Sequence, residues 1–155
     1  MRMTTSVIGM NSNLMFEHAT VDDCKLLELP EINMERGCIT PIGNGNEVPF
    51  DIKRIYFLFD VPHQSSRGGH AHKKLRQLIV AMGGAFDIEL FDGRRKRQVR
   101  LDRPNQGLLI VPGIWRELNR FSACSTCFVM ASELYDEEDY VRDLHHFREM
   151  KHPQA

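Results

Sequence analysis

The chain has 155 residues, of which 42% are hydrophobic and 26% are charged, and its formal net charge is -1. This length fits one domain, and the composition is ordinary for a soluble globular protein. The near-neutral charge gives no sign of a nucleic-acid or anionic-membrane partner, and no apolar run is long enough to predict a transmembrane helix.

The first fifteen residues, MRMTTSVIGMNSNLM, are too polar to form the apolar core of a signal peptide. We therefore expect a cytoplasmic protein. Residues 1–20 match no pattern that we can assign and are expected to form an N-terminal extension. Residues 21–150 are then expected to fold as one domain.

Short apolar runs recur after this extension and are separated by turn signals. Runs at this spacing predict an all-β sandwich or barrel. The runs are Cys24–Leu29, Gly37–Pro41, Ile52–Asp60, Gln77–Met82, Ala85–Phe91, Gln98–Leu101, Leu108–Val111, Trp115–Asn119 and Ser125–Ser132.

The pair Asp92-Gly93 lies between FDIELF and RRKRQVRL. It predicts a hairpin with a type I′ turn, which needs positive φ angles. The basic run Arg94–Arg97 follows directly. In a chain without net positive charge, we interpret this run as a solvated strand edge and not as a phosphate-binding patch.

The chain has four cysteines, and Cys124 and Cys127 form a C-x-x-C pair. The apolar run around this pair looks like a strand, on which positions i and i+3 point to opposite faces. We therefore expect buried free thiols and not a zinc or redox site.

The tail Asp136–Met150 is charged and mildly helical, and it should pack across one end of the fold. Its acidic residues Asp136, Glu137 and Asp139 are expected to be solvated or to cap a helix, and not to act in catalysis.

The stretch Arg67–Gln77, RGGHAHKKLRQ, places two histidines two residues apart. If Gly69–Ile79 is a loop that leads into a strand, His70 and His72 lie on one face, about 6.6 Å apart along the strand. On a face that lines a barrel interior, both imidazoles would reach a cavity and could act as general acid and base. A solvated histidine pair at a sheet edge is the alternative.

The spacing of His70, His72, Gln77 and Gly84 resembles the metal motif of the cupin barrels, and GLLIVPGIWRELN resembles their second motif. However, Gln77 stands at the position of the acidic ligand, and Arg116 at the position of the last histidine. An amide is a poor metal ligand, and a guanidinium cannot coordinate a metal. We therefore expect an all-β, single-domain cupin, a double-stranded β-helix or jelly-roll barrel, with no metal and no other cofactor.

Without a metal, two imidazoles can move a proton between adjacent carbons of one substrate. One group takes a proton from the carbon next to a carbonyl, and the same or the neighbouring group returns it one atom further on. The enediolate between these steps carries a negative oxygen. Arg67, Tyr56 and Arg116 are candidates to stabilise that oxygen.

The stretch Arg54–Asp60, RIYFLFD, together with Arg67–Gln77, resembles the nucleotide-sugar 3,4-ketoisomerases, which are WxcM-like cupin enzymes. GLLIVPGIWRELNRFS resembles the late barrel strand of this family, and ASELYDEEDYVRDLHHF resembles its C-terminal signature. These enzymes move the ketone of dTDP-4-keto-6-deoxyglucose from C4 to C3 and so prepare the sugar for an aminotransferase. The resemblance covers about residues 22–147.

The resemblance implies site residues. His70 and His72 would be the proton-transfer pair, with His72 as base or acid and His70 in support, and Tyr56 would line the sugar pocket or shuttle protons. Arg36 and Arg67 would hold the diphosphate or the enediolate oxygen. The remaining candidates for substrate binding are Gln77, Trp115, Arg116 and Glu117.

Some of these roles stay open. Trp115 could stack on the thymine ring or belong to the core, and Glu117 could hold a histidine or a substrate hydroxyl. The family often has W-H-E where this chain has Trp115-Arg116-Glu117, which leaves the role of Arg116 open.

The resemblance also implies a dTDP-linked keto sugar as ligand, no cofactor, and a homodimer with exchanged N-terminal strands. The product would lead to a 3-amino-3,6-dideoxy sugar, as in lipopolysaccharide O-antigen. Three alternatives remain: a dTDP-sugar epimerase, a metal-dependent cupin oxygenase in which His63 or Glu117 completes the ligand set, and a cupin that binds a sugar nucleotide without catalysis. The configuration of the product at C4 is also open.

Overall fold

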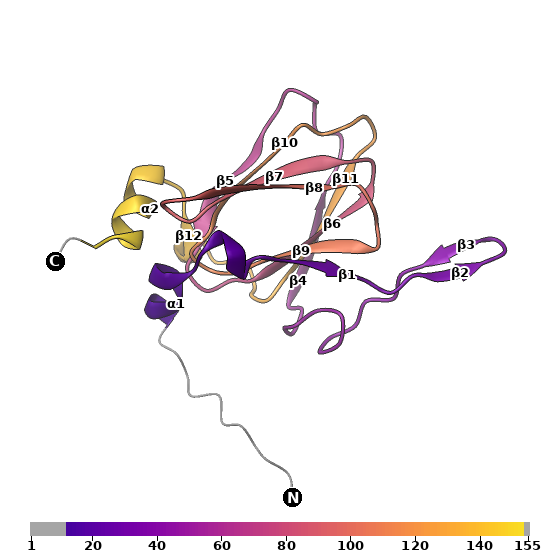
Figure 1. Ribbon diagram of the computed structural model, residues 1–155, viewed down its shortest axis with the longest axis horizontal. Coiled ribbons are helices and arrows are strands. Elements are labelled where there is room, and N and C mark those ends of the chain that lie inside the picture. The colour runs from indigo at the N-terminus through magenta and orange to yellow at the C-terminus, as the bar shows by residue number, and fades with distance from the viewer. Residues whose placement is uncertain (1–11, 154–155) are drawn as a thin grey trace, which may run out of the picture.

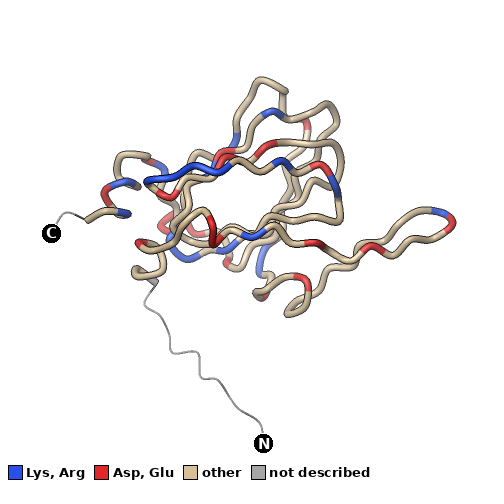
Figure 2. Tube along the Cα trace, viewed as in Figure 1, with Lys and Arg blue, Asp and Glu red and all other residues tan. Residues whose placement is uncertain are grey.

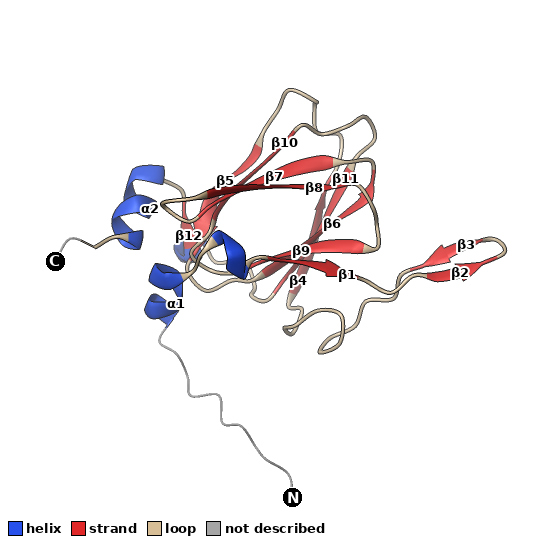
Figure 3. Ribbon diagram, viewed as in Figure 1, coloured by secondary structure: helices blue, strands red, loops and turns tan. Residues whose placement is uncertain are grey.

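The structure, a computed structural model, describes residues 12–153, and it consists mainly of two five-stranded antiparallel sheets (Figures 1 and 3). The first sheet has the strand order β1 (Lys25–Glu28), β9 (Gln106–Ile110), β6 (Gln77–Gly83), β11 (Thr126–Ala131) and β4 (Arg54–Leu58). The second has the order β12 (Tyr140–Val141), β5 (Arg67–His72), β10 (Trp115–Asn119), β7 (Phe86–Phe91) and β8 (Lys96–Leu101). The expectation of a β-rich fold is therefore confirmed.

The main core lies between the two sheets, which form opposite walls in Figure 1. Every second residue of β7 contributes to it, namely Phe86, Ile88 and Leu90, and all three are fully buried. Leu108 of β9 and Val129 of β11 meet them from the first sheet. This period-two pattern follows from the alternation of side chains along a strand, and each fully buried side chain of this size contributes about 1.5–3 kcal/mol to folding.

Two short helices pack against each other at one end, α1 (Ser12–His18) and α2 (Leu144–Lys151). Phe16 and Phe147 meet edge to face with ring centroids 5.9 Å apart. Lys151 donates to the carbonyl oxygens of Phe16 and Ala19 at 2.7 and 2.6 Å. The helical tail is therefore confirmed from Leu144 onward, whereas Tyr140–Val141 form strand β12. The boundary at residue 20 stays a prediction, and residues 1–11 of the expected extension lie outside the described residues.

The hairpin of β2 (Ile32–Met34) and β3 (Gly37–Ile39) projects away from the two large sheets (Figure 1). Residues 30–39 are all exposed. Two single-turn 3₁₀ helices, η1 (Val21–Asp23) and η2 (Glu137–Asp139), complete the described elements.

The hairpin between β7 and β8 forms as predicted, but its turn differs from type I′. Four residues separate the strands, and of the pair Asp92-Gly93 only Gly93 has a positive φ, 96°. The Asp92 carboxylate fills the turn and accepts from the N–H groups of Arg94 and Arg95 at 2.9 and 2.7 Å. An aspartate that binds its own loop backbone favours this longer turn.

The basic run Arg94–Arg97 lies in this turn and at the start of β8, at the edge of the second sheet (Figure 2). Arg95 and Lys96 are more than half exposed. The interpretation as a solvated strand edge is therefore confirmed.

The cysteine expectation is correct only in part. All four cysteines are free, and Cys127 is buried in β11. Cys124 is exposed, because it precedes the strand in a turn where its φ is 55°. The strand therefore begins later than the apolar run suggests.

Candidate active site

A cavity of about 470 Å³ lies between the two sheets. Its polar lining comprises four arginines, two tyrosines, His70, Gln77 and Ser66, and none of the described residues that line it is acidic. A cavity lined by several guanidinium groups attracts anions, because Arg binds phosphate and carboxylate oxygens well. The arginines are Arg54, Arg67, Arg116 and Arg142, and the tyrosines are Tyr56 and Tyr140.

Strand alternation places these side chains. On β4 the exposure alternates, so that Arg54 and Tyr56 face the cavity while Ile55 and Phe57 face outward, each more than half exposed. On β10, Arg116 and Leu118 face the cavity in the same way. The two walls of the cavity therefore come from different sheets.

The two histidines lie on β5, which begins at Arg67. Gly69–His72, expected to be part of a loop, therefore belongs to a strand, and only Lys73–Arg76 lies between β5 and β6. Their ring centroids are 4.9 Å apart, and the Tyr140 ring lies 4.9 Å from His70 and 4.4 Å from His72. His70 lines the cavity, whereas His72 is only 1% exposed and does not line it. His70 is therefore the imidazole that a ligand in the cavity would meet.

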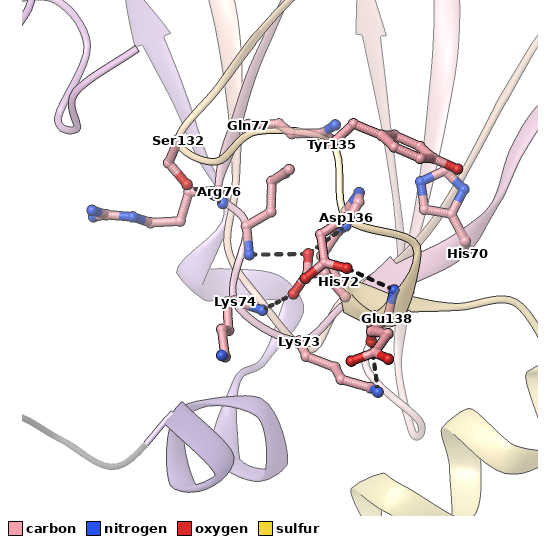
Figure 4. Close-up of polar contacts among 12 residues, drawn as sticks. His70, His72, Lys73, Lys74, Arg76, Gln77, Ser132, Tyr135, Asp136 and Glu138 are labelled. Carbon is pink, nitrogen blue, oxygen red and sulfur yellow. Dashed lines mark hydrogen bonds and ion pairs between the residues drawn. The ribbon is translucent and has the colours of Figure 1, made fainter. Parts of the chain in front are cut away.

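Asp139 holds His72. Its Oδ2 accepts from His72 Nδ1 at 2.8 Å, and its Oδ1 accepts from the N–H of Lys74 at 2.7 Å. Figure 4 shows His72 and Lys74 in this network. A carboxylate only accepts, so Nδ1 of His72 carries the proton and Nε2 is left as an acceptor. The expectation that Asp139 is a solvated or capping acid is wrong, since η2 and β12 fold back onto β5 and bury it.

The electrostatics of this group follow from burial. Burial alone would raise the pKa of Asp139, but the hydrogen bonds from His72 and the backbone lower it overall. Burial, with the neighbouring Arg116 cation, lowers the pKa of His70 to about 2 and that of His72 to about 3. Both imidazoles are therefore neutral near pH 7, and each has one ring nitrogen without a proton.

Arg116 is 2% exposed and is joined to its neighbours by hydrogen bonds. Its Nη2 donates to Gln77 Oε1, and its Nη1 donates to the carbonyl oxygen of His70 at 3.3 Å. Gln77 Nε2 in turn donates to the Tyr56 hydroxyl at 2.8 Å. Burial lowers the pKa of Arg116 to about 10, so Arg116 remains a cation at neutral pH.

Three of the expected binding residues lie outside this cavity. Trp115 is buried against Phe147, with ring centroids 5.7 Å apart, and donates from Nε1 to Glu117 at 3.3 Å. Both residues alternate with Arg116 and therefore lie on the opposite face of β10. Of the two alternatives for Trp115, the core is confirmed, and neither residue lines the cavity. Arg36 is exposed in the turn of the projecting hairpin, and its part in binding stays a prediction.

Apart from Ser66, four polar residues of the site were missed by the sequence analysis, namely Arg54, Asp139, Tyr140 and Arg142. Arg54 stands two positions before Tyr56, and the other three lie in the stretch YDEEDYVR. All four residues therefore lie in stretches that carry the family resemblance. Nothing local indicated that this stretch pairs with β5.

No group of three or more His, Cys, Asp or Glu side chains within residues 12–153 is placed to hold a metal ion. In the same part of the chain, no helix has the length and apolar character needed to cross a membrane.

Comparisons with known proteins agree with each other. A family model described as FdtA, WxcM-like, C-terminal, matches residues 22–152. A curated TDP-4-oxo-6-deoxy-alpha-D-glucose-3,4-oxoisomerase of Aneurinibacillus thermoaerophilus is 38% identical over 124 residues, which cover 80% of this chain and 89% of the relative.

Solved structures also match. A 3,4-ketoisomerase from Helicobacter canadensis is 41% identical with a TM-score of 0.81, and the match covers 83% of this chain and 97% of that one. A histidine-to-asparagine variant of the 3,4-ketoisomerase QdtA from Thermoanaerobacterium thermosaccharolyticum, in complex with TDP-4-keto-6-deoxyglucose, is 32% identical with a TM-score of 0.83. That match covers 87% of this chain and all of the other.

Proposed function

Because this chain belongs to the FdtA family of WxcM-like, C-terminal proteins and is an isomerase, we propose that it is a 3,4-ketoisomerase of dTDP-4-keto-6-deoxy-D-glucose. The carrying observation is a neutral His70 that lines an arginine-rich cavity next to Tyr56 and Arg116. A base and donors for a developing oxyanion are what moving a ketone along a sugar ring requires.

His70 is the base in this proposal, since it lines the cavity, whereas the sequence favoured His72 for the main role. His70 takes the proton from C3, and the C–H electron pair forms the double bond of an enediolate whose charge lies on O4. The proton on O3 passes to O4, and the imidazolium of His70 returns its proton to C4. C3 becomes the ketone and C4 the alcohol, so no electrons are supplied or removed.

His72 and Asp139 support this base. His72 is a buried neighbour of His70, and Asp139 fixes its tautomer with Nδ1 protonated. We assign them the positioning of His70 and the polarity of its surroundings.

The arginines select the ligand. Arg54 and Arg67 line the cavity without a neighbouring acid in the lining, and Arg54 has buried Nε and Nη2 atoms with no partner among the described residues. Buried donors without partners indicate a missing acceptor. A diphosphate supplies such oxygens, which supports a nucleotide-linked sugar, and the relative crystallised with a TDP-keto sugar supports dTDP in particular.

The finer fold and the assembly belong to the same proposal. The two sheets would be the walls of a cupin jelly-roll barrel. Two copies would form a homodimer by exchanging their N-terminal hairpins, because Ile32, Met34 and Ile39 of the hairpin and Ile55 and Phe57 of edge strand β4 are all more than half exposed.

We place the enzyme in the cytoplasm, in the synthesis of a 3-amino-3,6-dideoxy sugar such as those of lipopolysaccharide O-antigen. The four free cysteines support a reducing compartment. The proposal includes no nucleic-acid or membrane partner and no cofactor.

Proton NMR of the product tests the proposal. The purified protein, incubated with dTDP-4-keto-6-deoxyglucose, is expected to yield the 3-keto isomer, and His70→Asn should lower kcat at least about 10²-fold while dTDP binding persists. A product with the ketone still at C4 and one carbon inverted would indicate an epimerase. An unchanged sugar that nevertheless binds would indicate a binding protein.

A further inference from the structure

We propose that Arg116 and Gln77 are positioning residues that direct the hydroxyl hydrogen of Tyr56 into the cavity. Tyr56 then acts as a hydrogen-bond donor to the substrate's carbonyl oxygen and to the enediolate oxygen that replaces it. This inference rests on the proposed function and assigns a role to the two positions at which the chain departs from the cupin metal motif.

Arg116 determines which group donates and which accepts in this chain of hydrogen bonds. A guanidinium has donors only, so the Gln77 atom that faces Nη2 has to be the amide oxygen. The opposite orientation of the amide would place two donors against each other in a site where Arg116 and Gln77 are each 2% exposed. Burial makes such a mismatch expensive, because no water replaces the missing acceptor.

The orientation of Gln77 then fixes that of Tyr56. With Oε1 bound to Arg116, the group 2.8 Å from the Tyr56 oxygen is the Nε2 amide, which donates. The phenol oxygen is therefore the acceptor in this contact, and its own hydrogen is not used. Among residues 12–153, the Tyr56 hydroxyl makes no second hydrogen bond to a protein side chain or carbonyl, and the residue lines the cavity.

The same arrangement holds the donor beside the base. Arg116 also donates to the carbonyl oxygen of His70, so one guanidinium contacts the strand that carries the base and the amide that orients the phenol. Register supports this geometry, since Arg116 is directly opposite His70 in the β5–β10 pair.

Burial keeps the phenol protonated. Burial raises the pKa of Tyr56, and the nearby Arg116 cation opposes this rise only in part. The hydroxyl hydrogen therefore stays on the phenol at neutral pH. A neutral donor held in place suits an oxygen whose negative charge grows during the reaction, because the donor needs no reorganisation at that moment.

The variant Gln77→Glu tests the inference with almost no change in shape. A carboxylate accepts from Arg116 and also from the Tyr56 hydroxyl, so it withdraws the hydrogen from the cavity. We expect kcat to fall about 10²–10³-fold, as for loss of one oxyanion donor, with KM changed less than about threefold. Tyr56→Phe should have a similar effect. Gln64→Glu adds the same charge at an exposed position and should behave like the wild type.

A double variant separates hydrogen-bond direction from charge. If the carboxylate introduced by Gln77→Glu acts by capturing the Tyr56 hydrogen, both substitutions remove the same hydrogen bond to the substrate. The double variant with Tyr56→Phe should then have about the same kcat as each single variant. Independent effects that multiply, or a Gln77→Glu enzyme within about fivefold of the wild-type kcat, would overturn the inference and leave the ketoisomerase assignment intact.

Neutron diffraction of the deuterated wild-type protein gives a second readout that needs no activity. The expected map has deuterium on Gln77 Nε2 pointing at Tyr56 and the Tyr56 O–D directed into the cavity. An O–D directed at Gln77 would refute the relay, even if the wild-type enzyme fails to convert the keto sugar and the proposed function is lost.

Discussion

The carboxylate of Asp139 decides which nitrogen of His72 carries a proton. Its Oδ1 is bound to the N–H of Lys74, and its Oδ2 is bound to His72. The Leu75 N–H also donates to Oδ2, but at 3.4 Å, whereas the Lys74 N–H lies 2.7 Å from Oδ1. An asparagine at this position should therefore keep its oxygen toward the Lys74 N–H, so its amide nitrogen would face His72 Nδ1 and donate to it. The tautomer of His72 would then be reversed.

Asp139→Asn should therefore lower kcat about 10²-fold with little change in KM, because the variant alters a proton position next to the base without touching the ligand. Steady-state kinetics on the keto sugar measure both constants. Asp136→Asn is the matched control, since Asp136 only caps the η2 turn by accepting from the Glu138 N–H. A fully active Asp139→Asn enzyme would show that the tautomer of His72 has no part in turnover.

The sequence predicted individual site residues correctly where they belong to a local motif. His70, Tyr56, Arg67, Gln77 and Arg116 all lie at the cavity, and the H-x-H pair, the cupin-like motif spacing and the family resemblance indicated this. Asp139 was misjudged because its environment comes from a pairing between β12 and β5, whose residues are more than 60 positions apart in the chain. No local pattern predicts such a pairing.

The larger part of β5 was predicted to belong to a loop. Arg67–His72 contains two glycines with positive φ, 92° at Gly68 and 70° at Gly69, and such residues indicate a loop. The segment is nevertheless a strand, because it pairs with β10 and β12, and the register of the β5–β10 pair shifts between Arg116 and Glu117. The glycines allow the backbone to pass this irregularity.

The two glycines give a matched pair of variants. A Cβ at Gly68 would lie 2.9 Å from the carbonyl oxygen of Arg116, whereas a Cβ at Gly69 would have no neighbour within 4 Å. Gly69→Ala should lower the free energy of unfolding by about 1–2 kcal/mol, from backbone strain alone. Gly68→Ala should lower it further and also reduce kcat, since it displaces the Arg116 backbone. Urea unfolding and kinetics measure both, and equal losses in the two variants would contradict this interpretation.

One apolar surface of the molecule is exposed along edge strand β4. Ile55 and Phe57 on the outer face of edge strand β4 are 54% and 55% exposed. If this face is covered in the proposed dimer, Phe57→Lys should shift the protein to a monomer in light scattering, because a buried ammonium without a partner is costly. Lys96→Ala, on β8 of the other sheet, should leave the assembly unchanged. A wild-type protein that is monomeric at micromolar concentration would remove the dimer from the proposal.

The two buried histidines should make the stability of the whole molecule depend on pH. Their pKa values in the folded chain, about 2 for His70 and about 3 for His72, lie far below the value of about 6.5 expected when unfolded. As the pH falls below about 6.5, the unfolded chain therefore binds protons that the folded chain does not, and stability falls. Between pH 7 and about 5.5, each histidine should remove about 1 kcal/mol from the free energy of unfolding.

Urea denaturation at these two pH values measures the difference, and a window above about pH 5 keeps it separate from the titration of carboxylates such as Asp139. His70→Asn should lose about half of the pH dependence, because asparagine does not titrate. Activity should behave differently from stability. Because His70 stays neutral in the folded chain over this range, kcat/KM should not fall between pH 7 and about 5.5 while the protein is folded. A wild-type stability that is equal at both pH values would mean that the imidazoles are hydrated in solution and that the cavity is more open than the packing of Tyr140 against both rings indicates.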